Sequence, residues 1–80
     1  MDPAQIKALI ESELDDATAV VTTPDGTHFE AVVVSEAFAG KNTLMRHRLV
    51  YGALGERVGT AIHALSLQVF TPAEWSARQG

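Results

Sequence analysis

The sequence predicts an α+β fold in one domain spanning residues 1–80, in which a three-stranded sheet is covered by helices on one face. A chain of 80 residues with 46% hydrophobic content can bury one small core and little else. Helical apolar spacing alternates with three short runs rich in β-branched residues, in the order helix, strand, strand, one long or two short helices, strand, helix. There is no internal repeat, low-complexity tract or linker.

The first helix is expected from Pro3 to about residue 15. Asp2 is a good N-cap, Pro3 suits the first helical position, and Gln5 stands where a capping box requires it. The apolar positions then recur at helical spacing, which predicts an amphipathic helix with one buried face. These positions are Ile6, Leu9, Ile10 and Leu14.

A hairpin is expected next. The run TAVVTT at 18–23 and the run HFEAVVVSE at 28–36 have the composition of strands, and PDG at 24–26 is typical of a turn. Strand side chains alternate between faces. Phe29, Ala31 and Val33 are therefore expected on one face, and Glu30, Val32 and Val34 on the other.

The segment AFAGKN at 37–42 predicts a loop, after which Asn42 or Thr43 can cap a helix from Leu44 to about Val58. Gly52 and Gly55 can break or kink this helix, because glycine costs about 1 kcal/mol relative to alanine in a helix interior. Its apolar stripe is expected to comprise Leu44, His47, Tyr51, Leu54 and Val58.

The third strand is expected from Ile62 to Phe70. His63 shares a face with three apolar residues, at 65, 67 and 69, so it is either a buried, satisfied histidine or a ligand at the edge of the core. The segment Thr71–Glu74 has a second capping-box pattern, with proline at the first helical position. Trp75 is expected to begin a short terminal helix that folds back on the core.

The charge of the chain is unevenly distributed. The net charge is −4, but residues 37–58 are basic, while the first 36 residues carry eight carboxylates against Lys7. A basic patch on an acidic domain permits an anionic partner without favouring non-specific nucleic-acid binding. The apolar runs are far shorter than the roughly 20 residues that span a bilayer. We therefore expect a cytoplasmic protein that does not enter membranes.

Few residues offer catalytic chemistry. The chain has no cysteine, no serine in a Gly-x-Ser-x-Gly setting and no phosphate-binding glycine loop with lysine, so no enzyme is expected. The histidines lie too far apart in sequence for a local metal motif. His28 and His63 nevertheless each begin a strand beside a turn, and together they could make half of a metal site. His28 is otherwise an exposed hairpin residue, and His47 is interpreted as structural.

The segment FAGKNTLMRHR at 38–48 offers a different function. Backbone amides at a helix N-terminus can bind phosphate, and Lys41, Arg46 and Arg48 would add positive charge. A solvated basic helix face explains the same residues equally well. Aromatic side chains suited to stacking on single-stranded nucleic acid are scarce.

Two longer stretches resemble the BolA-like family: VVVSEAFAGKNTLMRHRLVYGAL, and IHALSLQVFTPAEW after it. The short chain and its Gly-Thr-His-Phe hairpin are most similar to the small IbaG-like bacterial branch. The resemblance implies a class II KH-like αββααβ(α) sandwich. The Gly-x-x-Gly loop of nucleic-acid-binding KH domains is absent, because the corresponding loop ends at Thr43. RNA binding is therefore not expected from the fold alone.

The resemblance also implies a function. BolA-like proteins are partners of monothiol glutaredoxins, with which they share a bridging [2Fe-2S] cluster. The family histidine at the start of the last strand corresponds to His63, and the second family ligand, in the loop between the first two strands, corresponds to His28. The glutaredoxin would supply its cysteine and a bound glutathione thiol. This predicts a non-enzymatic role in iron-sulfur cluster trafficking or iron homeostasis.

The family is also associated with DNA-binding transcription regulation, which remains the alternative, with Lys41, Arg46 and Arg48 contacting phosphates. The basic segment 40–48 would then be the DNA-binding surface. Under the first interpretation, the same basic helix would be a docking surface for the glutaredoxin. In isolation the protein is expected to be a monomer.

Overall fold

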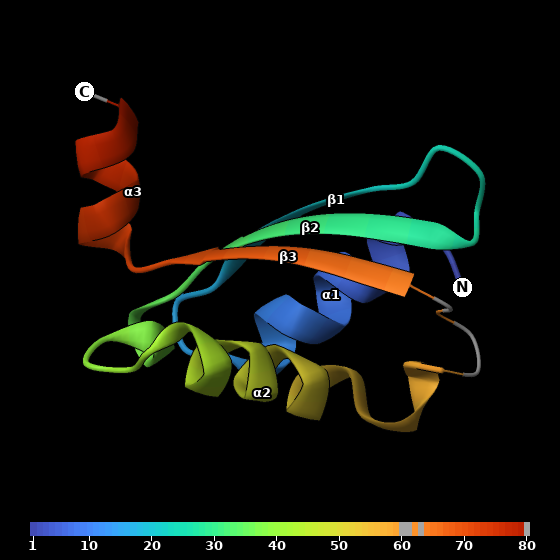
Figure 1. The fold of residues 1–80 in the computed structure, drawn as a ribbon, viewed down its shortest axis with the longest axis horizontal. Coiled ribbons are helices and arrows are strands. Elements are labelled where there is room, and N and C mark those ends of the chain that lie inside the picture. Colours follow the sequence, from blue (N-terminus) through green and yellow to red (C-terminus); the bar gives the residue numbers. More distant parts are fainter. Residues whose placement is uncertain (60–61, 63, 80) are drawn as a thin grey trace.

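The computed structural model describes residues 1–59, 62 and 64–79. Two helices lie on one side of a three-stranded sheet, and a third stands at one end of it (Figure 1). The expected α+β fold is confirmed. The elements are α1 (Pro3–Glu13), β1 (Thr18–Thr22), β2 (His28–Val34), the 3-10 helix η1 (Glu36–Phe38), α2 (Thr43–Leu54), the 3-10 helix η2 (Gly55–Arg57), β3 (Ala64–Phe70) and α3 (Pro72–Gln79).

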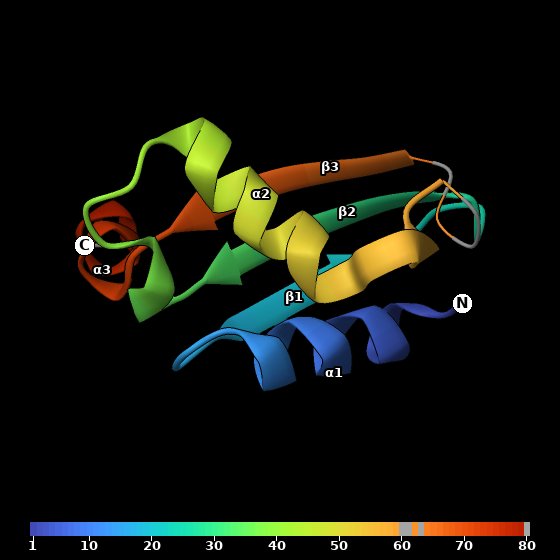
Figure 2. The same ribbon diagram turned by 90° about the horizontal axis from the view of Figure 1, so that it is seen from below.

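The strands lie in the order β1-β2-β3. The β1 and β2 strands are antiparallel, as expected of a hairpin, whereas β2 and β3 are parallel, with His28 opposite Ala64 and Val34 opposite Phe70. Parallel neighbours need a long crossover, because the chain must return to the end at which it began. The segment containing α2 provides this crossover and lies beside α1 across the same face of the sheet (Figure 2).

The core lies between the sheet and the two covering helices. Phe29, Ala31 and Val33 are all buried, which confirms the predicted alternation along β2. The predicted N-cap of α1 is also confirmed, because Asp2 and Gln5 form a capping box. The buried apolar residues are Ile6, Ile10, Leu14, Ala19, Phe29, Ala31, Val33, Phe38, Val50, Leu54 and Ile62.

The outer edge of β1 is covered by polar side chains of α1. The Lys7 ammonium donates to the Ala19 carbonyl at 2.8 Å, and the Ala19 amide donates to the Glu11 carboxylate at 2.9 Å. An edge strand otherwise leaves its backbone groups open to pairing with another chain. Glu11 is therefore a structural residue, and the hydrogen bond from Lys7 lowers its pKa.

The helix α2 is shorter than expected. Asn42 caps it by accepting from the Met45 amide, but the helix ends at Leu54 instead of near Val58. Gly55 adopts a φ of +62°, a conformation that favours glycine, and the chain continues as the 3-10 helix η2. The predicted break at Gly55 is thus confirmed, and the continuous helix to Val58 is not.

The predicted stripe of α2 is confirmed in part, at Leu54 and at Val58, which packs against the core. Val50 and Leu54 are fully buried, whereas Leu44 is 59% and Tyr51 39% exposed. His47 is half-buried. Because apolar residues occur on more than one side of this helix, more than one face satisfies helical spacing, and the face that packs includes Val50 in place of Tyr51.

The C-terminal helix also departs from expectation. The helix α3 begins at Pro72, and none of its residues, all of which are described, is buried. Trp75 packs against Phe70 with ring centroids 5.3 Å apart and, with Val20 and Val32, lines an apolar hollow on the uncovered face of the sheet. The helix therefore stands against the end of the sheet and does not fold back on the core. Within the described ranges, no helix is both long and apolar enough to cross a membrane.

Ser35 joins three parts of the chain and is fully buried. Its hydroxyl donates to the Asp15 carbonyl at 2.6 Å and accepts from the Ala37 amide at 3.0 Å. Its own amide donates to the Phe70 carbonyl at 3.0 Å. One residue therefore connects the loop after α1, the start of η1 and the end of β3.

We predict that Ser35→Ala lowers the free energy of unfolding by about 1–3 kcal/mol, because the Asp15 carbonyl and the Ala37 amide both lose their partner at a fully buried side chain. Urea denaturation followed by far-ultraviolet circular dichroism measures this change. Ser66→Ala, at an exposed position of β3, is the matched control and should change stability by less than about 0.5 kcal/mol. Equal stability of the two variants would contradict this role of Ser35.

Candidate functional site

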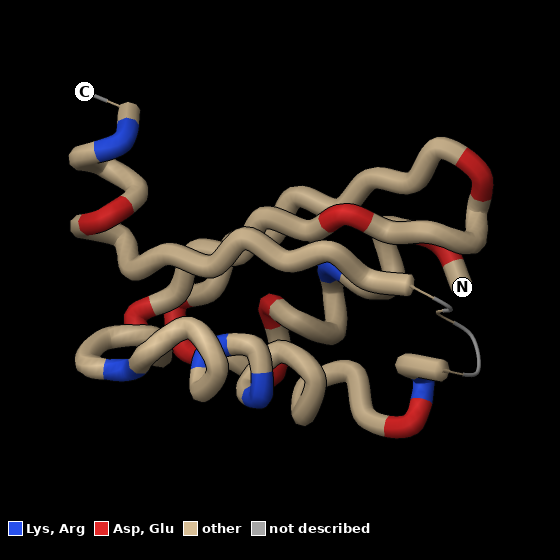
Figure 3. The backbone as a smooth tube through the Cα atoms, in the orientation of Figure 1, with Lys and Arg blue, Asp and Glu red and all other residues tan. Residues whose placement is uncertain are grey.

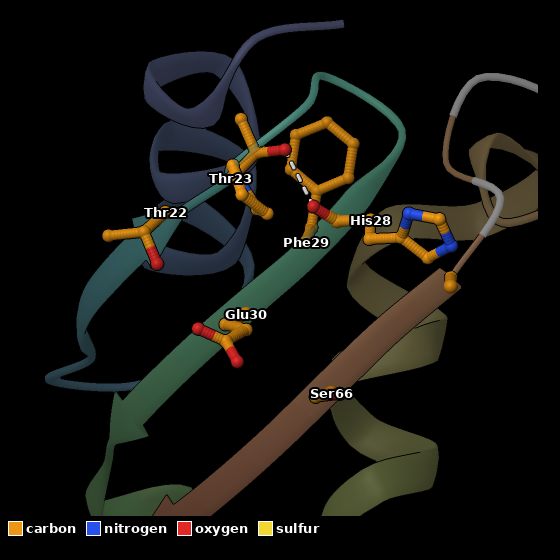
Figure 4. Close-up of a pocket in the computed structure, with 8 residues that line it drawn as sticks. Thr22, Thr23, His28, Phe29, Glu30 and Ser66 are labelled. Carbon is orange, nitrogen blue, oxygen red and sulfur yellow. Dashed lines mark hydrogen bonds between the residues drawn. The ribbon is translucent and has the colours of Figure 1, made fainter.

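The starts of β2 and β3 form an open hollow at one end of the sheet. Parallel pairing sets His28 beside Ala64 and Glu30 beside Ser66. The hollow has a volume of about 400 Å³, and Figure 4 shows the His28 ring at its edge, beside the start of β3. It is lined by Thr22, Thr23, Pro24, His28, Phe29, Glu30, Ala64 and Ser66.

His28 is accessible and has one defined side-chain partner. Its side chain is 64% exposed, and its Nδ1 atom lies 2.8 Å from the Oδ2 atom of Asp25. The residue thus combines an exposed imidazole with a fixed contact on one ring nitrogen. Such a ring can coordinate a metal ion through its other nitrogen, Nε2.

The turn that carries His28 is held by local hydrogen bonds. The Oδ1 atom of Asp25 accepts from the amides of Thr27 and His28, each at 2.9 Å. The Thr23 hydroxyl donates to the His28 carbonyl at 2.6 Å and accepts from the Gly26 amide at 2.9 Å. The amide and side-chain hydrogen bonds to Asp25 hold the pKa of this carboxyl well below its usual range. Hydrogen bonds within the turn therefore order it.

His63, the other predicted ligand, lies outside the described residues. The sequence nevertheless joins it directly to Ala64, the residue paired with His28. The structure therefore tests the predicted pairing for Ala64, and His63 itself stays a prediction.

Among the described residues, the donor set near the hollow is incomplete for a metal centre. Within the part of the chain that the structure describes, no group of three or more histidine, cysteine or carboxylate side chains is arranged to hold a metal ion. The sequence also contains no cysteine. His47 belongs to α2, which lies across the covered face of the sheet (Figure 2).

The basic segment does not act as one surface. Figure 3 shows basic residues on α2 and on the loop before it. Arg48 is exposed and Lys41 half-exposed, but the side chain of Arg46 is only 13% exposed. Its guanidinium donates to both carboxylate oxygens of Glu74, at 2.6 and 3.1 Å. Its Nε atom donates to the carbonyl of Lys41 at 2.8 Å.

These contacts give Arg46 a structural role. They engage the guanidinium that the sequence had suggested for phosphate binding. The guanidinium also lies 5.9 Å from the centre of the Phe38 ring. Glu74 in turn completes a capping box with Thr71, as the sequence predicted. Arg46 therefore fastens α3 to the start of α2, which leaves Lys41 and Arg48 as the residues of this segment that an anion could reach.

The sequence matches the family model described as BolA-like protein over residues 1–74. The chain belongs to the BolA-like family. Its relatives include human BolA-like protein 1, which is 46% identical over 65 residues, covering 79% of this chain and 47% of the human protein. The acid stress protein IbaG of Escherichia coli is 34% identical over 77 residues, covering 95% of this chain and 90% of IbaG. The expected resemblance to IbaG is thus confirmed.

A third relative is named the DNA-binding transcriptional regulator BolA of Escherichia coli, 43% identical over 66% of this chain and 50% of its own length. The chain thus spans about half the length of several curated relatives that it matches. Among solved structures, a BolA homologue from Coxiella burnetii has a TM-score of 0.84 and 45% identity, covering 95% of this chain and 97% of the homologue. These comparisons confirm the expected BolA-like fold.

Two partners of site residues were missed by sequence reasoning. Asp25 was counted only as part of a turn, although an aspartate three residues before a histidine in a tight hairpin is a recognisable signal for a side-chain contact. The partnership of Arg46 with Glu74 had no such signal, because the two residues are 28 positions apart.

We predict that the attachment of α3 is lost in acid. The hydrogen bonds from Arg46 and from the Thr71 amide lower the pKa of Glu74 to about 2. A lowered carboxyl pKa contributes stability above the pKa of the unfolded state, about 4.3, and this contribution disappears as the pH falls towards 2. Fluorescence of Trp75, the single tryptophan, reports on this helix.

In the wild type, the Trp75 emission should stay constant from about pH 7 to pH 5 and change at lower pH. Glu74→Gln should show the altered emission already at pH 7, with far-ultraviolet circular dichroism confirming that the sheet remains folded. An emission of Glu74→Gln identical to that of the wild type at pH 7 would show that the ion pair does not position α3.

Proposed function

We propose that this BolA-like protein is a non-enzymatic partner of a monothiol glutaredoxin and shares a bridging [2Fe-2S] cluster with it, in iron-sulfur cluster trafficking or iron homeostasis. His28 and His63 are the proposed ligands. The observation that carries the proposal is the exposed His28 at the open end of the sheet, in register with the residue that follows His63. Family membership supports it independently.

The donor chemistry fits a shared cluster better than a resident one. Iron-sulfur clusters are held mainly by thiolates, and this chain has none. Imidazole can replace thiolate on one iron, as it does in Rieske centres. A chain that offers histidines at an open edge can therefore complete a cluster whose thiolates come from the cysteine of a glutaredoxin and from glutathione. Neutral imidazole ligands leave less negative charge on the cluster and favour a higher reduction potential.

The shape of the hollow suits this role. It opens to solvent where two strands begin, so a partner can approach without rearrangement of the core. The ordered turn presents His28 at a fixed place, which reduces the entropy lost when the complex forms. In this proposal the chain supplies and orients donor nitrogens, and the partner brings the cluster.

We predict that adding the wild-type protein to a monothiol glutaredoxin loaded with a [2Fe-2S] cluster and glutathione changes the visible circular dichroism of the cluster. His63→Ala should abolish the change, and His28→Ala should weaken or abolish it, because each removes a nitrogen donor. His47→Ala is the matched control, since it removes a histidine from the covered side of the sheet. An unchanged spectrum with the wild type would refute the shared cluster for this pair.

DNA binding is the second candidate function. It is favoured by the similarity to the Escherichia coli protein named as a DNA-binding regulator and by the exposure of Arg48 and the partial exposure of Lys41. The net charge of −4 opposes it. Since Arg46 is engaged with Glu74, the phosphate contacts would come from Lys41 and Arg48.

If these two residues bind phosphates, Lys41→Ala combined with Arg48→Ala should weaken DNA binding at low salt. The slope of log affinity against log salt should fall by about 2, since each phosphate contact releases about one counterion. Fluorescence anisotropy with labelled duplex DNA measures both quantities, and His28→Ala serves as a control at the other end of the molecule. An unchanged affinity and slope in the double variant would remove the basic segment from DNA binding.

A further inference from the structure

We propose that Asp25 is a positioning residue that holds the His28 ring in the tautomer whose Nε2 atom is free to bind iron. The inference rests on the proposed function, because it concerns the orientation of a proposed ligand. It derives from the two oxygens of the Asp25 carboxylate, which make different contacts.

The first oxygen accepts hydrogen bonds from the backbone. Oδ1 of Asp25 accepts from the amides of Thr27 and His28, the arrangement by which aspartate or asparagine closes a tight turn. An asparagine oxygen would make the same two hydrogen bonds. The turn by itself therefore does not require a carboxylate at position 25.

The second oxygen contacts the imidazole. Oδ2 lies 2.8 Å from Nδ1 of His28, and an ionised carboxylate can only accept hydrogen bonds. The proton of the neutral ring is consequently held on Nδ1, and the lone pair is left on Nε2. Without such a partner, neutral imidazole samples both tautomers.

Stability of the fold does not account for this contact. The two side chains are 64% and 48% exposed, and exposed charge pairs contribute little to stability because water competes with them. A carboxylate behind an imidazole is, by contrast, the common outer partner of a metal-binding histidine, since it fixes the ring and makes its donor nitrogen more basic. A more basic donor offsets part of the negative charge lost when imidazole replaces thiolate.

The substitution Asp25→Asn separates the two roles. An asparagine oxygen can keep the backbone contacts of the turn, but its amide group then faces Nδ1 and donates to it. The ring proton would move to Nε2, and the donor nitrogen of the ligand would be blocked. Asp25→Ala removes both roles, and Thr23→Val removes the two hydrogen bonds of the Thr23 hydroxyl in the same turn without touching the ring.

The first readout uses the metal-free protein. Long-range proton-nitrogen correlation spectra at about pH 8 assign the ring proton of each histidine. We expect the proton on Nδ1 of His28 in the wild type and in Thr23→Val, and on Nε2 in Asp25→Asn, with the backbone amide shifts of the turn preserved in the asparagine variant. A proton on Nε2 in the wild type, or no change in Asp25→Asn, would overturn the inference.

The second readout is the visible circular dichroism titration of a [2Fe-2S]-loaded monothiol glutaredoxin with glutathione. Loss of an outer partner of a ligating histidine typically weakens metal binding 10- to 100-fold, and we expect a loss of about this size for Asp25→Asn but not for Thr23→Val. Equal titration midpoints for the asparagine variant and the wild type would overturn the positioning role. A wild-type protein that leaves the spectrum unchanged would refute the proposed function, whereas the tautomer assignment would still decide whether Asp25 orients the ring.

Discussion

The parallel pairing of β2 with β3 is the constraint on which the arrangement of this molecule depends. Because the two strands run in the same direction, both begin at one end of the sheet, and residues near their starts come together although they lie more than thirty positions apart in sequence. An antiparallel pairing of β2 and β3 would have placed His28 beside the end of β3. The crossover through α2 that parallel pairing requires also covers the sheet and closes the core.

The two ends of the sheet are built differently. At the end where β2 and β3 finish, Ser35 and Arg46 connect segments that are distant in sequence through side-chain hydrogen bonds. At the other end, the turn that carries His28 is held by hydrogen bonds among residues 23–28, beside the pairing of His28 with Ala64. Long-range side-chain contacts thus connect segments at one end, and local hydrogen bonds order the turn of the candidate site at the other.

Sequence reasoning predicted what depends on local patterns. The capping boxes at Asp2 and Thr71, the alternation along β2 and the glycine break at Gly55 were all confirmed, because each follows from residues only a few positions apart. The pairing of strands and the choice of the buried face of α2 depend on distant segments. In α2, apolar residues at Leu44 and Tyr51 offered a face as regular as the one containing Val50, which is the face that packs.

Prediction of the candidate site was also limited by contacts between residues that are distant in sequence. The resemblance to the BolA-like family pointed to His28, but the role of a charged residue follows from its neighbours in space. Arg46 looked like a phosphate ligand because its sequence neighbours are basic, yet its guanidinium is occupied by a carboxylate 28 positions away. Asp25 looked like a turn residue, and it is one, but its second oxygen reaches the imidazole.

The different contacts at the two ends of the sheet determine which residues can be replaced without loss of the fold. A site ordered by its own turn can change its side chains with little effect on the core, since no buried group loses a partner when the exposed residues Asp25 or His28 are replaced. The residues that fasten α3 lack this freedom, because Arg46 contacts Glu74, the carbonyl of Lys41 and the ring of Phe38 together. Ligand chemistry can therefore vary at the hairpin end while the packing at the other end maintains the fold.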